Sequence, residues 1–428
     1  MIVNRTEVPS IKQINSFNIV KAAGQVFPNG VPFYSINSND GDFIKIEWMF
    51  VAGNWVQPSP LVAFAVNSML SEGSQKYSSV QISEMIDFYG AFLSFNVDKD
   101  FAFVSLMCMG KYLAEVLEIV EEVIKNATFP EHELEVFRNK HKQQFLVEQT
   151  KVRNIARSEH AGLLFGTDHP YGYKVVDSDF DKLNRDSLVQ FHRERYQSAN
   201  CKIIASGKVD ENVVKTIEQY FGVSFWNAQQ TLSYPVCQPQ TSPGKKVLIE
   251  KDDAVQSAVR IGKVLFNKHH SDYHGMQILN CILGGYFGSR LMAKIREEKG
   301  YTYGINSLFV TLKNEGYLAI VSELGTEVTV PAIEDIYAEI EKLRQEPVAE
   351  DELERVKNYI LGDIVRMFDG PFAQAESFIS LIENDLDYDH FDQMISTVKN
   401  ITAGELQLLA QKYFDPASFT QVVVGKMK

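Results

Sequence analysis

The sequence is poor in cysteine. Its four cysteines, at positions 108, 201, 237 and 281, are separated by 93, 36 and 44 residues and form no C-x-x-C pair. Disulfide-stabilised scaffolds need a much higher cysteine density, so the chain does not belong to that class. The scarcity favours a reducing compartment.

Long apolar runs are also missing. No run approaches the ~18 residues that a membrane-spanning helix needs. The first 21 residues include Asn4, Arg5, Glu7, Lys12 and Gln13 and contain no apolar stretch of signal-peptide length. We therefore expect no membrane association and a cytoplasmic protein, or a periplasmic one if a signal peptide was removed.

Basic residues are outnumbered. The 428 residues include 42 Lys and Arg against 55 Asp and Glu, which gives a formal net charge of -13. The average surface would repel a polyanion, so nucleic-acid binding is not expected. Hydrophobic residues make up 45% of the chain, which excludes a disordered protein, and the length predicts two to four domains of about 100–200 residues.

Common catalytic motifs are absent: there is no G-x-S-x-G, no P-loop and no G-x-G-x-x-G. The run that starts at His132 would begin H-E-x-x-H, but Val136 occupies the second histidine position. Three histidines cluster at His269, His270 and His274, and the last two could share one face of a helix. No third ligand lies near them in the sequence, so a solvated helix start is favoured over a metal site.

What the sequence does contain is an internal repeat. Residues 188–209 and 406–427 both read as an amphipathic helix with an aromatic end, a short turn and a β-branched strand that closes on Gly-Lys. Equivalent residues lie 217–219 positions apart at several places along the chain. Such a constant offset indicates two copies of one unit.

A proline-containing segment separates the copies. Residues 226–246 contain three prolines, no acidic residue and no helical period, and are predicted to be a linker. The predicted domains are therefore residues 20–225 and 247–428. Strands and helices occur in blocks in each half, which indicates an α+β fold: one antiparallel sheet covered by helices, formed twice.

The two halves share one order of expected elements. A strand is followed by a short helix, a hairpin and two long helices, and two capping boxes, at Ser78 and Thr402, mark helix starts. In the first half the expected elements are residues 43–51, 61–70, 92–109, 111–126 and 131–165. In the second half they are residues 255–266, 272–283, 301–324, 329–344 and 350–368.

Several short motifs occur in a recognisable order. They are Ala52-Gly-Asn, the run over residues 166–172, the run over residues 283–291 and the run over residues 295–303. Together with the duplication, they make the chain resemble the insulinase or pitrilysin family of inverted-zincin metallopeptidases, which includes the mitochondrial processing peptidase subunits. The resemblance implies a processing-peptidase-like fold in each half.

Active members of that family carry H-x-x-E-H on the first helix and a further glutamate roughly eighty residues later. The aligned positions here are Phe64 and Ser68 for the histidines, Asn67 for the general base and Gln144 for the distal glutamate. Phenyl, amide and hydroxyl groups cannot replace two imidazoles and a carboxylate on Zn²⁺. The resemblance therefore implies a degenerate zinc motif and no metal or other cofactor in this chain.

The resemblance also assigns roles in the second half. Family members use an arginine and a tyrosine seven residues later, and Arg296 and Tyr303 have this spacing. The tyrosine would donate to the oxyanion of the scissile carbonyl, and the arginine would hold a substrate carbonyl. Without the family, Arg296 reads as part of a solvated charged turn and Tyr303 as the start of a strand.

These residues imply a non-catalytic subunit of a zinc metalloendopeptidase. Its partner would be a homologous H-x-x-E-H subunit that holds the zinc, and the heterodimer would bind an extended peptide by strand addition. In isolation the chain could form a homodimer. The alternative is a catalytically inactive scaffold or interaction protein of the same fold, and no motif supports an independent hydrolase with another nucleophile.

Overall fold

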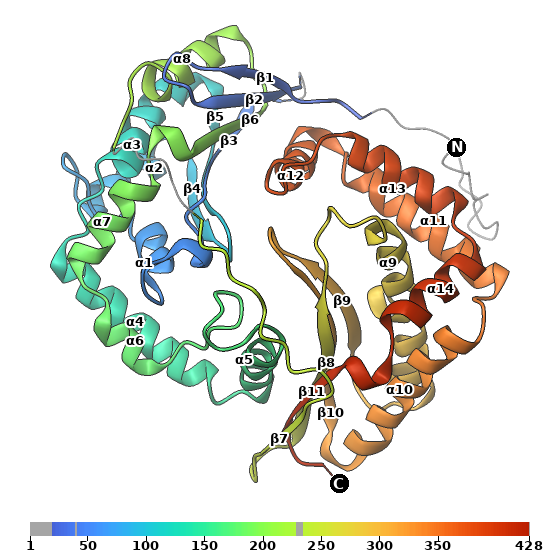
Figure 1. Cartoon of the computed structure of the whole chain (residues 1–428). Coiled ribbons are helices and arrows are strands. Elements are labelled where there is room, and N and C mark those ends of the chain that lie inside the picture. The colour runs from blue at the N-terminus through green and yellow to red at the C-terminus, as the bar shows by residue number, and fades with distance from the viewer. Residues whose placement is uncertain (1–18, 39–40, 228–233, 428) are drawn as a thin grey trace, which may run out of the picture.

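Two β-sheets form the centre of the structure, and helices cover the outer face of each (Figure 1). One sheet comes from each half of the chain, which confirms the predicted fold class. The computed structural model describes residues 19–38, 41–227 and 234–427. Residues 1–18, used for the signal-peptide prediction, and residues 228–233 of the predicted linker lie outside this part.

The first sheet has six strands. In order across the sheet they are β1 (Ala23–Val26), β2 (Pro32–Asn37), β6 (Cys201–Gly207), β3 (Phe43–Phe50), β5 (Ala102–Met109) and β4 (Phe92–Val97). The second sheet has five, in the order β7 (Lys246–Glu250), β11 (Thr420–Gly425), β8 (Gln256–Leu265), β10 (Gly316–Gly325) and β9 (Ile305–Thr311). Apart from β1, the two sheets have the same topology: β2, β6, β3, β5 and β4 of the first correspond in order to β7, β11, β8, β10 and β9 of the second. The sequence repeat requires this agreement.

Each sheet departs from the expected antiparallel arrangement at one pair of strands. β2 pairs with β6 and β7 pairs with β11 in parallel, whereas the other pairs are antiparallel. Parallel neighbours need a long crossover connection. Here the crossover connection is nearly all of the half between the two strands, because the last strand of each half, β6 or β11, returns to lie beside β2 or β7.

The helices repeat only in part, with eight α-helices in the described residues of the first half and six in those of the second. Those of the first half are α1 (Val62–Ser68), α2 (Ser79–Phe88), α3 (Leu113–Lys125), α4 (Glu131–Glu148), α5 (Val152–Phe165), α6 (Asp177–Lys182), α7 (Arg185–Arg195) and α8 (Glu211–Phe221). Those of the second are α9 (Tyr273–Asn280), α10 (Thr329–Gln345), α11 (Glu350–Arg366), α12 (Gly370–Ile382), α13 (Asp389–Asn400) and α14 (Ala403–Tyr413). Both predicted capping boxes form, at the start of α2 and of α14.

One predicted helix is divided in two. The sequence predicted a continuous helix over residues 131–165, but α4 ends at Glu148 and α5 begins at Val152. Lys151 between them has an extended backbone, and the Asn154 amide donates to the Glu148 carbonyl at 3.0 Å, which closes the turn. The break matters because α5 leaves the first half and packs on β8 and β11 of the second sheet.

The exchange of helices is reciprocal. Ala156 of α5 packs with Ala258 and Val422 of the second sheet. In return, α12 packs on β2 and β6 of the first sheet, where the rings of Phe378 and Tyr34 lie 4.9 Å apart, edge to face. In Figure 1, α5 lies beside the second sheet and α12 beside the first. Each half therefore contributes one helix to the core of the other.

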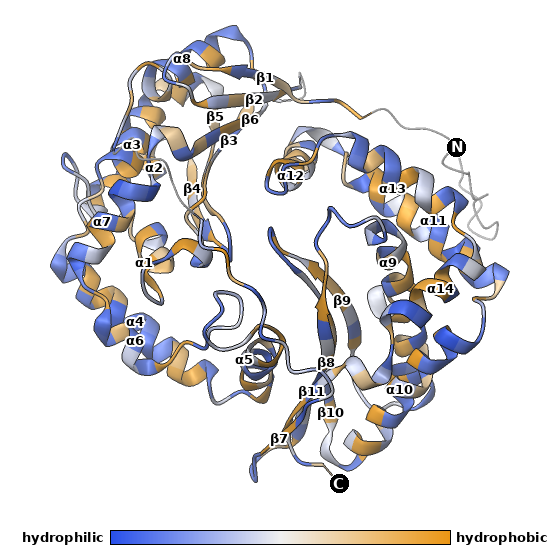
Figure 2. Cartoon of the chain, viewed as in Figure 1, coloured by the Kyte–Doolittle hydropathy of each residue, from blue (hydrophilic) through white to orange (hydrophobic). Residues whose placement is uncertain are grey.

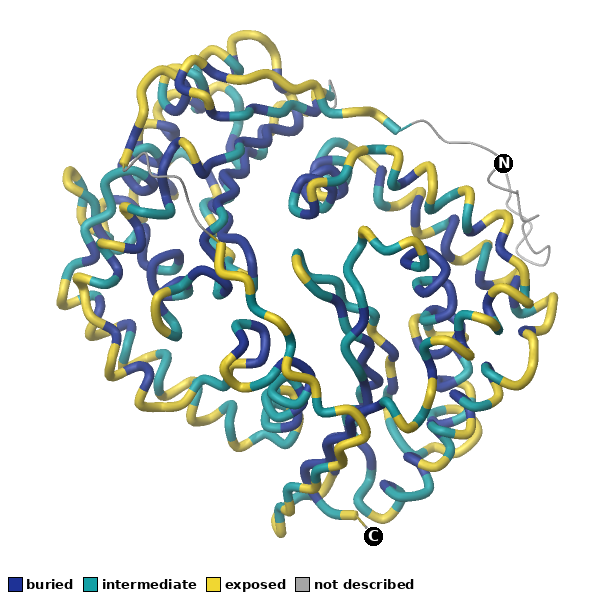
Figure 3. The backbone as a smooth tube through the Cα atoms, viewed as in Figure 1, coloured by how far each residue is buried: buried dark blue, intermediate teal, exposed yellow. Residues whose placement is uncertain are grey.

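The core of each half lies between its sheet and its outer helices. In the first half, the rings of Trp48 and Phe221 are 5.0 Å apart and those of Phe50 and Tyr196 are 4.7 Å apart, all buried. Figure 2 shows hydrophobic residues along the strands and a mixture of hydrophobic and hydrophilic residues on the outer helices. Figure 3 shows buried residues along the strands and exposed ones along the outer helices.

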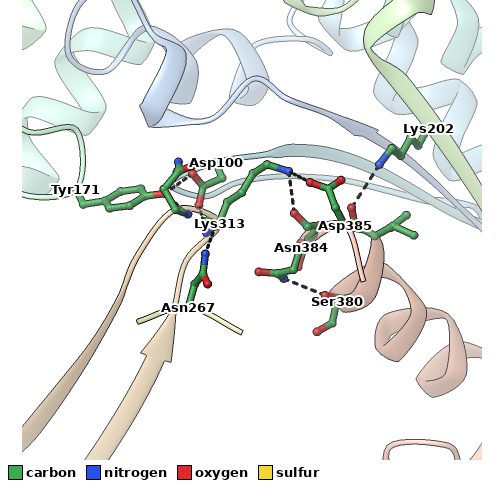
Figure 4. Close-up of polar contacts among 11 residues, drawn as sticks. Asp100, Tyr171, Lys202, Asn267, Lys313, Ser380, Asn384 and Asp385 are labelled. Carbon is green, nitrogen blue, oxygen red and sulfur yellow. Dashed lines mark hydrogen bonds and ion pairs between the residues drawn. The ribbon is translucent and has the colours of Figure 1, made fainter. Parts of the chain in front are cut away.

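The tips of the two hairpins meet where the sheets approach one another (Figure 4). The Tyr171 hydroxyl and the Lys313 backbone N–H donate to the two carboxylate oxygens of Asp100, at 2.6 and 3.1 Å. The Lys313 ammonium also forms an ion pair with Asp385 at 2.9 Å. Charged hydrogen bonds therefore hold the turn after β9 against the turn after β4.

This contact region makes stability depend on pH through Glu383. Burial, with the negative charges of Asp98, Asp100 and Glu47, raises the pKa of Glu383 to about 7, against the opposing charge of Lys268. The folded chain therefore binds this proton more tightly than the unfolded chain. The resulting stability is fully present below about pH 4.5 and is lost as the pH rises through 7.

We expect Glu383→Gln to match the wild type at pH 4 and to exceed its free energy of unfolding at pH 8 by about 1–3 kcal/mol. Urea unfolding at the two pH values measures the difference. Glu376→Gln, on α12 and with a carboxylate 69% exposed, should show no such change. A Glu383→Gln effect of equal size at both pH values would show that Glu383 is ionised throughout.

Candidate functional site

Three of the degenerate-motif positions lie on α1, and the first of them faces α4. The Phe64 ring is 5.5 Å from the Phe137 ring and 5.0 Å from the His141 ring, between centroids. Phe137 and His141 are themselves stacked obliquely at 4.3 Å. An aromatic cluster therefore occupies the place where the family resemblance puts the first histidine ligand.

Asn67, at the general-base position, has a packing role. It is 1% exposed, and its amide donates to the Tyr196 hydroxyl at 3.0 Å and to the Phe103 carbonyl at 3.3 Å. Burial raises the pKa of Tyr196, so Asn67 faces a neutral phenol. These hydrogen bonds connect α1 to β5 and to the end of α7.

The distal position lies on α4. Gln144 is exposed and lies one helical turn after His141. Burial and the charge of Lys140 lower the pKa of His141, so the imidazole is neutral at pH 7. The sequence analysis did not single out His141. Its position one helical turn before Gln144 could have indicated that it lies close to the degenerate motif.

The donor set does not fit a catalytic zinc ion. Such a site uses three protein ligands, usually histidines with a carboxylate. Phe64 offers none, the Asn67 amide is already bonded in the core, and His141 is the one imidazole of the group. Among the described residues, no three His, Cys, Asp or Glu side chains are grouped for a metal ion.

The purified chain should hold no stoichiometric zinc at Phe64, Asn67, Ser68 and Gln144, because these residues supply no imidazole or carboxylate. Elemental analysis after gel filtration in metal-free buffer measures this. One tightly held zinc per chain, lost on replacing residues among these four, would contradict the prediction. Zinc that is instead lost on His141→Ala would identify another site.

The histidine cluster of the second half does not form one site. The His270 ring stacks on Phe266 at 3.9 Å, and its Nδ1 accepts from the Asp272 N–H. The His274 ring instead lies 4.6 Å from the ring of His390. The two imidazoles therefore have different neighbours.

Arg296 and Tyr303 lie on either side of one turn. Arg296 is in a π-helical segment, Met292–Glu298, whose end is closed by hydrogen bonds from Gly300 to the Arg296 carbonyl and from Tyr301 to the Ile295 carbonyl. Its guanidinium carbon is 4.8 Å from the centre of the Phe287 ring. Within the described part of the chain, it forms no ion pair.

Tyr303 comes just before β9 and is 91% exposed. Its hydroxyl has no hydrogen bond to any described residue. Its neighbour Tyr301 is part-buried against the core of the second half. In the described ranges, no hydrogen bond, ion pair or ring contact joins Arg296 or Tyr303 to any of the four degenerate-motif positions, so the structure does not bring the two sets of predicted residues into contact.

Two family models match the chain. The model described as insulinase, peptidase family M16, matches residues 60–160, and the peptidase M16 inactive domain matches residues 182–360. Together they cover well over half of the sequence. The chain belongs to peptidase family M16. The insulinase match includes all four degenerate positions, and the inactive-domain match includes Arg296 and Tyr303.

Individual proteins and solved structures are also similar to this chain. "Uncharacterized zinc protease YmxG" of Bacillus subtilis is 22% identical over 306 residues, covering 71% of this chain and 73% of that protein. "Non-peptidase homolog YmxG" of Helicobacter pylori is 21% identical over 303 residues, with coverages of 69% and 68%. The crystal structure of a peptidase M16 inactive domain from Pseudomonas fluorescens has a TM-score of 0.85 at 20% identity and covers 96% of this chain and 99% of that one.

These similarities support a catalytically inactive protein of the M16 fold. The side chains of the degenerate motif agree, since they lack the ligands of a zinc protease. The four cysteines are free. Of the helices in the described residues, none has the length and apolar character to cross a membrane.

Proposed function

We propose that this M16 chain is the zinc-free subunit of a two-chain metallopeptidase and completes the active site of a homologous H-x-x-E-H partner. The observation that carries the proposal is the presentation of Tyr303. A tyrosine that only stabilised the fold would bury its ring, whereas this ring is 91% exposed. Its hydroxyl is available to a ligand or to a second chain.

The chemistry assigned to the pair follows from their side chains. The Tyr303 hydroxyl would donate to the oxyanion that forms when water attacks a peptide carbonyl in the partner's site. Arg296, held against Phe287 and without a described ion pair, would donate to a neighbouring carbonyl of the extended peptide. Both groups act through hydrogen bonds and need no metal of their own.

A partner is required because the chain's own motif cannot supply the attacking water. Phe64, Asn67 and Ser68 stand where two imidazoles and a general base would be needed. The zinc would therefore belong to the companion, and the two chains would form a heterodimer. As a homologue of this chain, the companion would have the same fold.

A second candidate function is a scaffold or interaction protein with no part in proteolysis. The relative named as a non-peptidase homolog favours it. A scaffold would need neither Arg296 nor Tyr303. Substitutions at these two residues would therefore lower peptidase activity only if the first candidate function is correct.

Co-purification from the native cell, followed by peptidase assays, tests the proposal. We expect a homologous chain with intact H-x-x-E-H to co-purify, and peptide hydrolysis to appear only when both chains are present. Gel filtration of this chain alone separates a monomer from a homodimer. A companion that is fully active alone, or the failure of any such chain to bind, would leave the scaffold as the function.

A further inference from the structure

A cavity of about 490 Å³ lies between the two halves, and none of the four degenerate-motif residues lines it, although Leu61 before α1 and Phe145 beside Gln144 do. Its walls come from α4 and α5 of the first half and from β8 and β10 of the second. This volume falls within the roughly 300–1,000 Å³ of small-molecule sites. The exchanged helix α5 contributes much of the lining.

Three cationic side chains line this cavity: Lys99, Arg157 and Arg260. They come from the β4–β5 turn, from α5 and from β8. Burial and the like charge of Arg157 lower the pKa of Lys99, and burial lowers that of Arg260. None of the three forms an ion pair with a described residue. The fold therefore gathers positive charge here, and the one opposing charge on Lys99 is that of its neighbour Asp100, which is outweighed by burial.

Buried polar atoms at the cavity also lack partners. His160 of α5 is 1% exposed, and its Nε2 has no hydrogen-bond partner among the described residues. The buried Nε of Arg260 likewise has none. Burial and the charge of Arg260 lower the pKa of His160 to about 3, so the imidazole is neutral. Unsatisfied buried polar groups are costly and call for a ligand or water.

The one acidic side chain in the lining does not neutralise the cations. The carboxylate of Glu148 pairs with Lys151 and accepts from the Asn154 amide. Much of the remaining lining is apolar or aromatic, with Phe165 and Tyr317 packed edge to face at 5.8 Å. The cavity thus offers cationic donors beside an apolar surface.

We propose that this cavity binds a carboxylate carried on an apolar body, with Arg157, Arg260 and Lys99 on the carboxylate and Phe165 against the apolar part. Arginine suits carboxylates because its planar fork donates two parallel hydrogen bonds. Two sources share this chemistry: the C-terminus of a peptide that ends in an apolar residue, and a medium-chain fatty acid. The preference for a peptide as the ligand rests on the proposed function. The inference that the cavity binds a carboxylate does not depend on it.

Calorimetric titration of the whole chain, without a companion, tests the site. The probes are a short peptide that ends in free-acid phenylalanine, the same peptide as its amide, and decanoate. We expect the free acid to bind at least about tenfold more tightly than the amide, and more weakly at high salt. Tighter binding of decanoate than of the peptide acid would keep the site and assign it to fatty acids.

Substitutions locate the binding. Arg157→Gln and Arg260→Gln should each weaken binding of the acid by roughly tenfold or more. Arg153→Gln is the matched control, because Arg153 lies one turn before Arg157 on the same helix and is exposed like it, but is not part of the cavity lining. If Arg260→Gln lowers the melting temperature, Lys99→Gln on the hairpin turn provides the same test.

Equal binding of acid and amide, no binding of any probe, or full binding by Arg157→Gln would overturn the site. A chain that binds the acid and yet fails to activate any companion would contradict the proposed function alone. The two failures are therefore distinguishable.

Discussion

In a pair reconstituted with a zinc-bearing companion, Tyr303→Phe should lower turnover by roughly 10²–10³-fold. The substitution removes one hydroxyl, and because the ring is 91% exposed, it removes no core packing. If the hydroxyl stabilises the oxyanion, the loss falls on kcat, whereas assembly of the pair stays unchanged. Steady-state kinetics and gel filtration of the same samples measure the two effects.

Two further variants make the result specific. Tyr301→Phe is the control, since Tyr301 packs against the core and should keep nearly full turnover. Arg296→Ala should weaken substrate binding, because it removes a charged donor to the peptide. An active pair in which Tyr303→Phe retains full turnover would contradict the assigned role and favour the scaffold.

The duplication could be predicted because the same short local signals occur in the same order in both halves. The run from His132 and the run from Asp351 sit 219 residues apart in the sequence, and they mark the first turns of α4 and α11. The strand that ends each half was equally visible, as β-branched residues closing on glycine. Local periodicity and caps depend on neighbours in the chain, so sequence alone carries them.

The exchange of α5 and α12 was not predictable. The apolar face of α5 has ordinary helical spacing, and nothing in that spacing says that Ala156 packs on the other half of the chain. The helix break at Lys151 depends on a side-chain hydrogen bond from Asn154, which periodicity does not encode. Tertiary contacts of this kind appear only when the whole fold is assembled.

Of the two candidate sites, one could be located from the sequence and the other could not. The positions Phe64, Asn67, Ser68 and Gln144 came from the family resemblance, and the structure adds what their side chains contact. The cation-lined cavity could not be seen, because Lys99 and Arg260 are distant in sequence and meet only through the contact between the halves.

The docking of α5 on the second sheet depends on the absence of a side chain at Gly262 of β8. A Cβ added there would lie 2.1 Å from the Leu318 carbonyl oxygen and 2.9 Å from Cε1 of His160. The first of these is backbone of the neighbouring strand and cannot rotate away. Gly262→Ala should therefore lower the free energy of unfolding by about 3 kcal/mol, the upper range for overpacked cores.

A matched substitution separates this clash from the general effect of replacing glycine. Gly362 lies within α11 and has no heavy atom within 4 Å of an added Cβ. Gly362→Ala should raise stability by roughly 0.5–1 kcal/mol, because alanine loses less backbone freedom in a helix. Urea unfolding of both variants measures the contrast. If Gly262→Ala is as stable as Gly362→Ala, then β8 and β10 are not held at the observed separation, and α5 does not fix the two halves against one another.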